Sequence, residues 1–209
     1  MERRNEKKTK KKGVIKMRKI LSGISLLVLC LGLAGIGYAA TTADVNVKVS
    51  ITGTALSVAV INPGTTTYTW DAGGNAAGTW TVNTSSISVI NDSGGLTEKY
   101  KLNATDATRS GGTTWTLADT LGVNNQYAMR ARLNGSTQPN NDDTDFSVAD
   151  HNLTTTPVDC TASKFAGTEA GASVSDGEYR GLWIRVGRPT STVDPAEHQA
   201  TLVITAATP

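Results

Sequence analysis

Apolar and polar residues alternate strictly along residues 45–52 of this chain. The odd positions carry the apolar side chains, which are Val45, Val47, Val49 and Ile51. The even positions carry polar side chains. Because successive side chains of a β-strand point to opposite faces, this pattern predicts a strand with one face on a hydrophobic core.

The same two-residue period returns along the rest of the chain, with turn signals such as Asn-Pro-Gly and Asp-Ser-Gly-Gly between the segments. The expected strands cover residues 45–52, 55–61, 66–72, 79–82, 86–92, 98–104, 114–120, 126–135, 179–187 and 198–206. Short alternating segments at this spacing are typical of an all-β domain. We therefore expect a single antiparallel β-sandwich of about nine strands, jelly-roll or Ig-like, and we identify no helical pattern within it.

The first 39 residues have the pattern of a secretory signal peptide. A basic region precedes an apolar run over residues 20–36, and Gly37-Tyr38-Ala39 places small residues at the cleavage site. This order predicts a cleaved leader that forms a helix before its removal, with leader peptidase as a transient partner during export. Residues 40–209 would then form one secreted or cell-surface domain, with no stable membrane insertion after cleavage.

Three alternatives to a cleaved leader remain. The glycines of the apolar run disfavour an uncleaved membrane anchor. Leu29 stands before Cys30 where a lipoprotein needs a small residue, and a strand begins where a type IV pilin needs a long helix.

Removal of the leader changes the charge of the protein. The whole chain carries 20 basic and 18 acidic side chains, whereas residues 40–209 carry 10 basic and 16 acidic ones, a net charge of −6. A nucleic-acid partner needs a basic surface, so we do not expect one. Cleavage also leaves a single cysteine, Cys160, which predicts either a buried thiol or an intermolecular disulfide.

No pattern of catalytic residues stands out. The histidines, His151 and His198, lie in dissimilar polar contexts, and the chain has no Gly-x-Ser-x-Gly motif and no His and Cys at metal-ligand spacing. Two carboxylates that meet only in the folded chain remain an alternative, since glycoside hydrolysis needs no sequence motif. We expect a protein that is not an enzyme.

The densest acidic segment is Asn-Asn-Asp-Asp-Thr-Asp, residues 140–145, within a polar insertion over residues 134–145. Its carboxylates belong to Asp142, Asp143 and Asp145. Carboxylates at this density suit calcium, although the EF-hand spacing is absent. The segment predicts either a calcium-binding loop or a solvated polar loop. We expect no cofactor, with calcium as the one alternative.

Four tryptophans, at positions 70, 80, 115 and 183, stand out among few aromatic residues. Core packing is the common fate of Trp, and exposed Trp platforms bind sugars. Trp183 lies out of phase with the apolar residues Leu182, Ile184 and Val186 and shares a face with Arg185. If the apolar face is the core, Trp183 and Arg185 form an exposed interface or glycan-binding pair. The alternative is a sheet that is buried on both faces.

Three segments resemble secreted proteins of the TasA/camelysin type. They are "GIGYAATTA" at the end of the leader, "GTALSV", and "ISVINDSGGLTEKYKL", in which an I-x-V-x-N strand precedes a Gly turn and a strand bearing Tyr and Leu. The likeness covers the first third of residues 40–209. It implies a jelly-roll-like subunit of an extracellular matrix fibre, and it transfers no functional residue.

Two functions follow from these expectations. The strand that carries Val45, Val47, Val49 and Ile51 either pairs within its own domain or is donated to a neighbouring subunit. Donation from copy to copy builds a homopolymer, a pilus-like or matrix filament. The alternative is a secreted module that binds a glycan or a cell surface through Trp183 and the 134–145 loop.

Overall fold

The computed structural model describes residues 42–52, 58–60, 66–122 and 124–209. It describes the side chains of all of these residues except 42–44, 51–52 and 58–60. The expected leader and Cys30 lie outside the described residues. Within them, no helix is long and apolar enough to span a membrane.

Strands dominate the described chain. They are β1 (Thr42–Thr52), β2 (Val58–Val60), β3 (Thr67–Ala76), β4 (Trp80–Val82), β5 (Ile87–Asn91), β6 (Lys99–Ala104), β7 (Thr116–Leu117), β8 (Gln126–Leu133), β9 (Val158–Asp159), β10 (Tyr179–Gly187) and β11 (His198–Ala207). One helical turn, α2 (Val148–His151), follows β8. The expectation of an all-β domain is confirmed.

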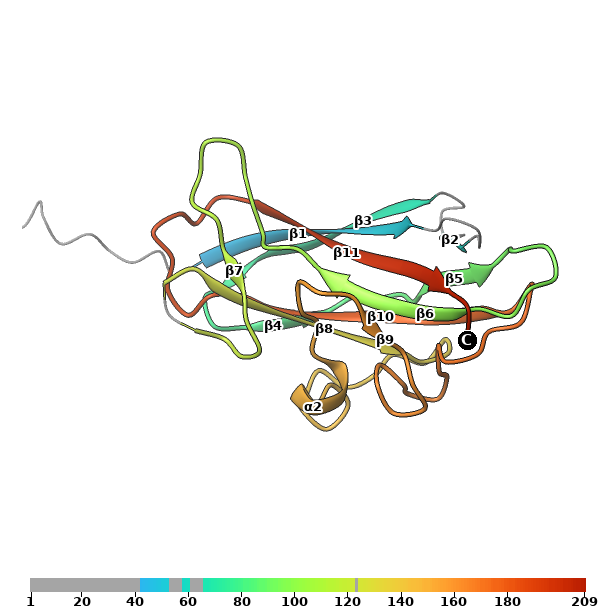
Figure 1. The fold of residues 1–209 in the computed structure, drawn as a ribbon. Helices are drawn as coiled ribbons and strands as arrows, with labels where there is room; N and C mark the ends of the chain where they lie inside the picture. Colours follow the sequence, from blue (N-terminus) through green and yellow to red (C-terminus); the bar gives the residue numbers. More distant parts are fainter. Residues whose placement is uncertain (1–41, 53–57, 61–65, 123) are drawn as a thin grey trace, which may run out of the picture. The chain divides into compact units, whose positions relative to one another are not determined.

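The strands form two sheets that face each other across one core (Figure 1). The first sheet has the order β3-β1-β11-β6-β9, and the second has the order β2-β5-β10-β8-β7, with β4 paired to the second half of β10. Most pairs are antiparallel, but β1 runs parallel to β11, and β7 runs parallel to β8. The expectation of purely antiparallel sheets is therefore wrong. No tight turn joins β1 to β11, so no hairpin fixes their relative direction.

Alternate residues of the long strands meet in a single hydrophobic core. The first sheet contributes, among others, Val45, Val47, Val49, Tyr100, Leu102, Ala200, Leu202 and Ile204, and the second contributes Ile87, Val89, Met129, Leu133, Leu182, Ile184 and Val186. The two-residue period thus assigned the core-facing residues of these strands correctly.

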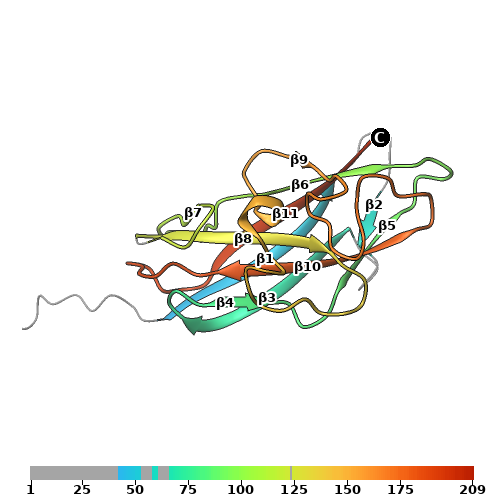
Figure 2. The same ribbon diagram turned by 90° about the horizontal axis from the view of Figure 1, so that it is seen from below.

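The outer face of the second sheet is covered by polypeptide (Figure 2). α2 and the polar insertion that precedes it lie over β8 and β10 on the side away from the first sheet. Trp183 and Arg185 are consequently 1% and 4% exposed. The prediction that these two residues are exposed is wrong, and the alternative of a sheet buried on both faces holds here.

A glycine allows the insertion to pack this closely. A Cβ atom at Gly181 of β10 would lie 2.6 Å from the carbonyl oxygens of Asn134 and Gly135. Both oxygens accept the indole N–H of Trp183, at 2.7 and 3.0 Å. Phe146, at the far end of the insertion, packs with Trp183 and Val82 in a small second cluster.

Candidate functional site

β1 is the strand for which the sequence left internal pairing and donation open. In this structure it lies inside its own sheet, between antiparallel β3 and parallel β11, so the alternative of internal pairing holds here. Its register with β11 runs from Val45–His198 to Thr52–Thr205. A bulge between Asp44 and Asn46 shifts its register with β3.

The core-facing side chains of β1 are completely enclosed. Val45, Val47 and Val49 are each 0% exposed. The side chain of Ile51 lies outside the described residues, and its backbone pairs with Ile204. β1 is paired on both edges and buried on one face, and we call the space that it fills between β3 and β11 the slot. Without β1, β11 and β3 would each present an open edge beside an exposed core.

The outer face carries a second constellation, in which two arginines are buried side by side. Arg130 of β8 and Arg185 of β10 are direct cross-strand partners. Their guanidinium carbons lie 4.6 and 4.3 Å from the centroid of the Trp80 ring, so both cations contact its face. Both also donate to one oxygen of Asp143, Oδ1, at 2.6 and 2.5 Å. We call Trp80, Arg130, Arg185 and Asp143 the arginine cluster.

Asp143 closes the cluster from the solvent side. Its side chain is 71% exposed, whereas those of Arg130 and Arg185 are 2% and 5% exposed. The hydrogen bonds from Arg185 and then from Arg130 hold the pKa of the Asp143 carboxyl below its ordinary value. The ionised carboxylate of Asp143 thus forms salt bridges with two buried cations of the sheet, and these salt bridges hold the insertion against the sheet.

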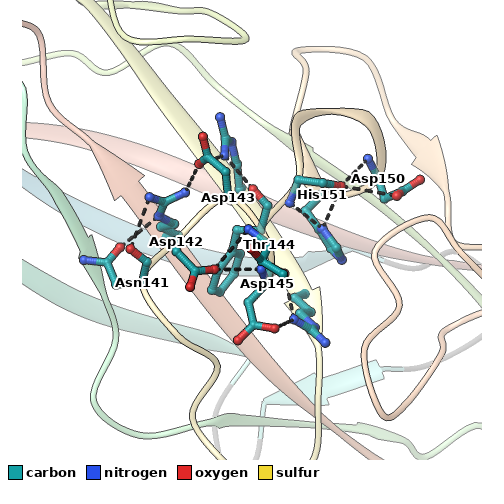
Figure 3. A network of polar contacts seen from close by, with 12 residues as sticks. Asn141, Asp142, Asp143, Thr144, Asp145, Asp150 and His151 are labelled. Atoms are coloured by element: carbon teal, nitrogen blue, oxygen red, sulfur yellow. Dashed lines mark hydrogen bonds and ion pairs between the residues drawn. The ribbon is translucent and has the colours of Figure 1, made fainter.

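The carboxylates of Asp142 and Asp145 also have partners, of two different kinds (Figure 3). Asp145 accepts from Nη1 of Arg132 at 2.6 Å, and the amide of Asn140 together with Arg132 lowers its pKa. Asp142 Oδ1 accepts the backbone N–H groups of Thr144 and Asp145 and so shapes the turn.

This arrangement does not support the calcium prediction. Asp142, Asp143 and Asp145 each face a different partner, and among the described residues no three His, Cys, Asp or Glu side chains converge on a point that could hold a metal ion. The reason is the buried arginines, whose charges bind the carboxylates that calcium would need. Residues 140–144 are exposed, as the solvated-loop alternative expects, and Asp143 and Asp145 in addition form salt bridges with arginines of the sheet.

The tryptophans offer no open platform for a sugar. Trp115 and Trp183 are buried, Trp70 is half-buried against the core, and the half-buried Trp80 lies against the arginines. The glycan-binding alternative loses the residue on which it depended, because Trp183 is enclosed by the 134–145 insertion.

One grouping near α2 has the composition of a hydrolase triad, which the sequence did not indicate. Ser147 Oγ lies 3.3 Å from Nδ1 of His151 and 3.2 Å from Oδ2 of Asp150 (Figure 3). The backbone N–H of Ser147 donates to the same Nδ1, so the ring carries its proton on Nε2, which donates to Ala166 O. Burial lowers the pKa of His151 and keeps the ring neutral. With its lone pair occupied, His151 cannot take a proton from Ser147; the hydroxyl is the N-cap of α2.

Cys160 is a free, buried thiol packed in the main core. This placement matches the expectation of a buried apolar cysteine, and burial raises its pKa.

No protein-family model matches the chain, and no curated protein matches it.

Proposed function

We propose that this protein is an exported structural subunit of an extracellular or cell-surface fibre, a jelly-roll-like sandwich whose copies assemble by exchanging β1. The observation that carries the proposal is the double role of β1, which is the first strand of the domain and an interior strand of its sheet. Because β1 lies at the end of the domain, it can leave its place in the sheet without any other segment having to pass through the fold. Its departure opens the two edges and the apolar groove that another copy of β1 fits.

Exchange preserves the contacts of the closed domain. β1 of one copy would take the same register between β3 and β11 of the next, with Val45, Val47 and Val49 in the same core positions. Such swapping is a low-cost route to association, and repeated head to tail it builds an open filament. The likeness to TasA/camelysin-type proteins supports the same assignment.

The buried position of β1 also sets when exchange takes place. A folded copy would have to uncover its core to release the strand, so folded copies exchange slowly. Chains that fold together, as newly exported chains do, meet with the slot still open. We therefore expect β1-exchanged polymers when the chains fold at high concentration. Chains that fold at low concentration and are concentrated afterwards should not exchange β1.

A cysteine pair tests the exchange directly. Lys48 and Thr201 are in-register partners of β1 and β11 on the outer face of the sheet. In the variant Lys48→Cys/Thr201→Cys of residues 40–209, oxidation after concentrated refolding should give a ladder of covalent multimers on a non-reducing gel, and after dilute refolding a cross-linked monomer. Each single variant is the control. Cross-linked monomer alone, at every refolding concentration, would reject the proposal.

A further inference from the structure

The outer edge of β3 is the longest edge in the described part of the molecule. β3 ends the first sheet, and within the described residues no strand pairs with its outer side. In the second half of β3, the carbonyl oxygens of Ala72 and Gly73 accept hydrogen bonds from the Arg188 side chain. Along Tyr68–Asp71, the described structure shows no backbone hydrogen bond beyond the pairing with β1. We call Tyr68–Asp71 the edge segment.

The edge segment lacks the devices that keep sheet edges apart. Proteins protect edges with lysine, proline or very short strands. β9 is two residues long, and its Asp159 is paired with Lys99 and Lys101. β2 and β7 have three and two residues. The edge segment, by contrast, belongs to a ten-residue strand and carries one charge, on Asp71.

We propose that the edge segment is the contact surface for a second copy of this protein, which adds its own β3 antiparallel about a twofold axis at Thr69. The two first sheets then form one continuous sheet across the dimer. This interface is isologous and leaves β1 in its own slot, so it is separate from the exchange proposed above.

The chemistry of the strand favours its own copy as the partner. With Thr69 opposite Thr69, each Tyr68 faces Trp70 of the other copy. Tyr68 and Trp70 are half-buried and pack on the core, so their remaining exposed area is covered by the neighbouring aromatic ring. Aromatic pairs and Thr–Thr pairs are favourable cross-strand neighbours.

The single charge of the edge segment is placed without conflict in this register. Asp71 lies opposite Thr67, and the two aspartates stay apart. A register centred on Asp71 would bring the two carboxylates together.

A charge at Thr69 tests the proposal without weakening the monomer. Thr69 is exposed and pairs with Lys48 of β1. Thr69→Glu therefore gains a cross-strand cation within its own sheet, whereas in the dimer two glutamates meet at the axis. Thr201→Glu is the matched control, because Thr201 is the partner of Lys48 on β11, inside the sheet. Sedimentation velocity of protein that was folded at low concentration and then concentrated, from micromolar to millimolar, should show a reversible dimer for the wild type and Thr201→Glu and a monomer for Thr69→Glu.

Cross-linking fixes the register. Thr69→Cys should oxidise to a covalent dimer that grows no further, because directly opposed residues of an antiparallel pair lie within disulfide reach. Asp71→Cys, which faces Thr67, should not. A wild type that stays monomeric at millimolar concentration, or Thr69→Glu that dimerises like Thr201→Glu, overturns the inference. Because the protein is folded at low concentration, where β1 exchange is not expected, the outcome is independent of that exchange.

Discussion

The imidazole of His198 is stacked on the indole of Trp115, with ring centroids 3.9 Å apart and planes inclined by 17°. Both side chains are fully buried. The two ring nitrogens of His198 lie 2.7 and 2.6 Å from the carbonyl oxygens of Ala196 and Thr113. His198 is the first residue of β11 and pairs with Val45 of β1. The stack therefore connects the segment before β7, which carries Trp115, to the β11 end beside the start of β1.

We expect the ring contact and the polar contacts of His198 to contribute separately. His198→Phe keeps a stacked ring but leaves two carbonyl groups without a partner, and should lower the free energy of unfolding by about 2–3 kcal/mol. His198→Ala also removes the stack and should cost about 1 kcal/mol more. Urea unfolding measures both. Equal stability of the two variants would show that the stack contributes nothing.

The salt bridges of Asp143 should be sensitive to acid. The folded-state pKa of Asp143 is lowered, so its stabilisation is complete above the unfolded value of about 3.9 and is lost as the pH falls below it towards the folded value. Asp143→Asn should destabilise the protein by about 1–2 kcal/mol at pH 7, a modest loss because solvent screens the exposed carboxylate.

The difference between wild type and Asp143→Asn should shrink as the pH drops below about 4. Thermal melts from pH 3 to 7 check this, with Asp142→Asn as the control, because Asp142 shapes the turn and contacts no arginine in the described structure. A difference that does not change with pH would mean that Asp143 acts only through its shape.

Gly181 should be indispensable for the cap over the second sheet. A methyl group at this position would meet two backbone carbonyl oxygens at 2.6 Å. Gly181→Ala should displace the start of the insertion, cost about 1–3 kcal/mol and shift the emission of Trp183 to the red as water reaches the ring.

Gly135→Ala is the matched control for Gly181→Ala. Its Cβ would find its nearest neighbour at 3.6 Å, an ordinary contact, so stability and fluorescence should stay close to wild type. If both variants behave alike, the close approach at Gly181 is not what seats the insertion.

Cys160 should be inert in the folded protein. Its thiol is 1% exposed, and burial raises its pKa, so little thiolate reaches solvent. Labelling by a thiol reagent should be at least about a hundredfold slower in the native protein than in urea, because it requires local opening. A covalent dimer of the wild type through this thiol would instead support the intermolecular disulfide.

The alternation along the chain was a sound guide to strands and to their core faces. The expected strand over residues 179–187 coincides with β10, and Tyr100 and Leu102 face the core while Lys99 and Lys101 face outward. The two-residue period contains no information on the relative direction of paired strands. For this reason the parallel pairing of β1 with β11 was not predicted. β9 and α2 were missed because two and four residues are too few to show a period.

The candidate site was harder to predict, because burial of a polar face depends on residues far away in the chain. Arg185 was expected to be exposed, and the two-residue period places Arg130 and Arg132 on the face opposite the core residues of β8. An insertion with two suitably placed carboxylates, those of Asp143 and Asp145, covers these arginines. The three acidic side chains that suggested calcium were the signal for this cover. For Asp143 and Asp145 the counter-ions are arginines of β8 and β10, in other parts of the sequence.

The parallel pairing of β1 and β11 has a mechanical consequence. The described chain enters this ladder at one end, near Thr42, and leaves it at the other, past Ala207. A force that draws the two ends apart slides the strands past each other along their length, so the hydrogen bonds of the ladder bear the load together and do not open one by one. We expect the domain to yield only at high tension when it is stretched between its ends.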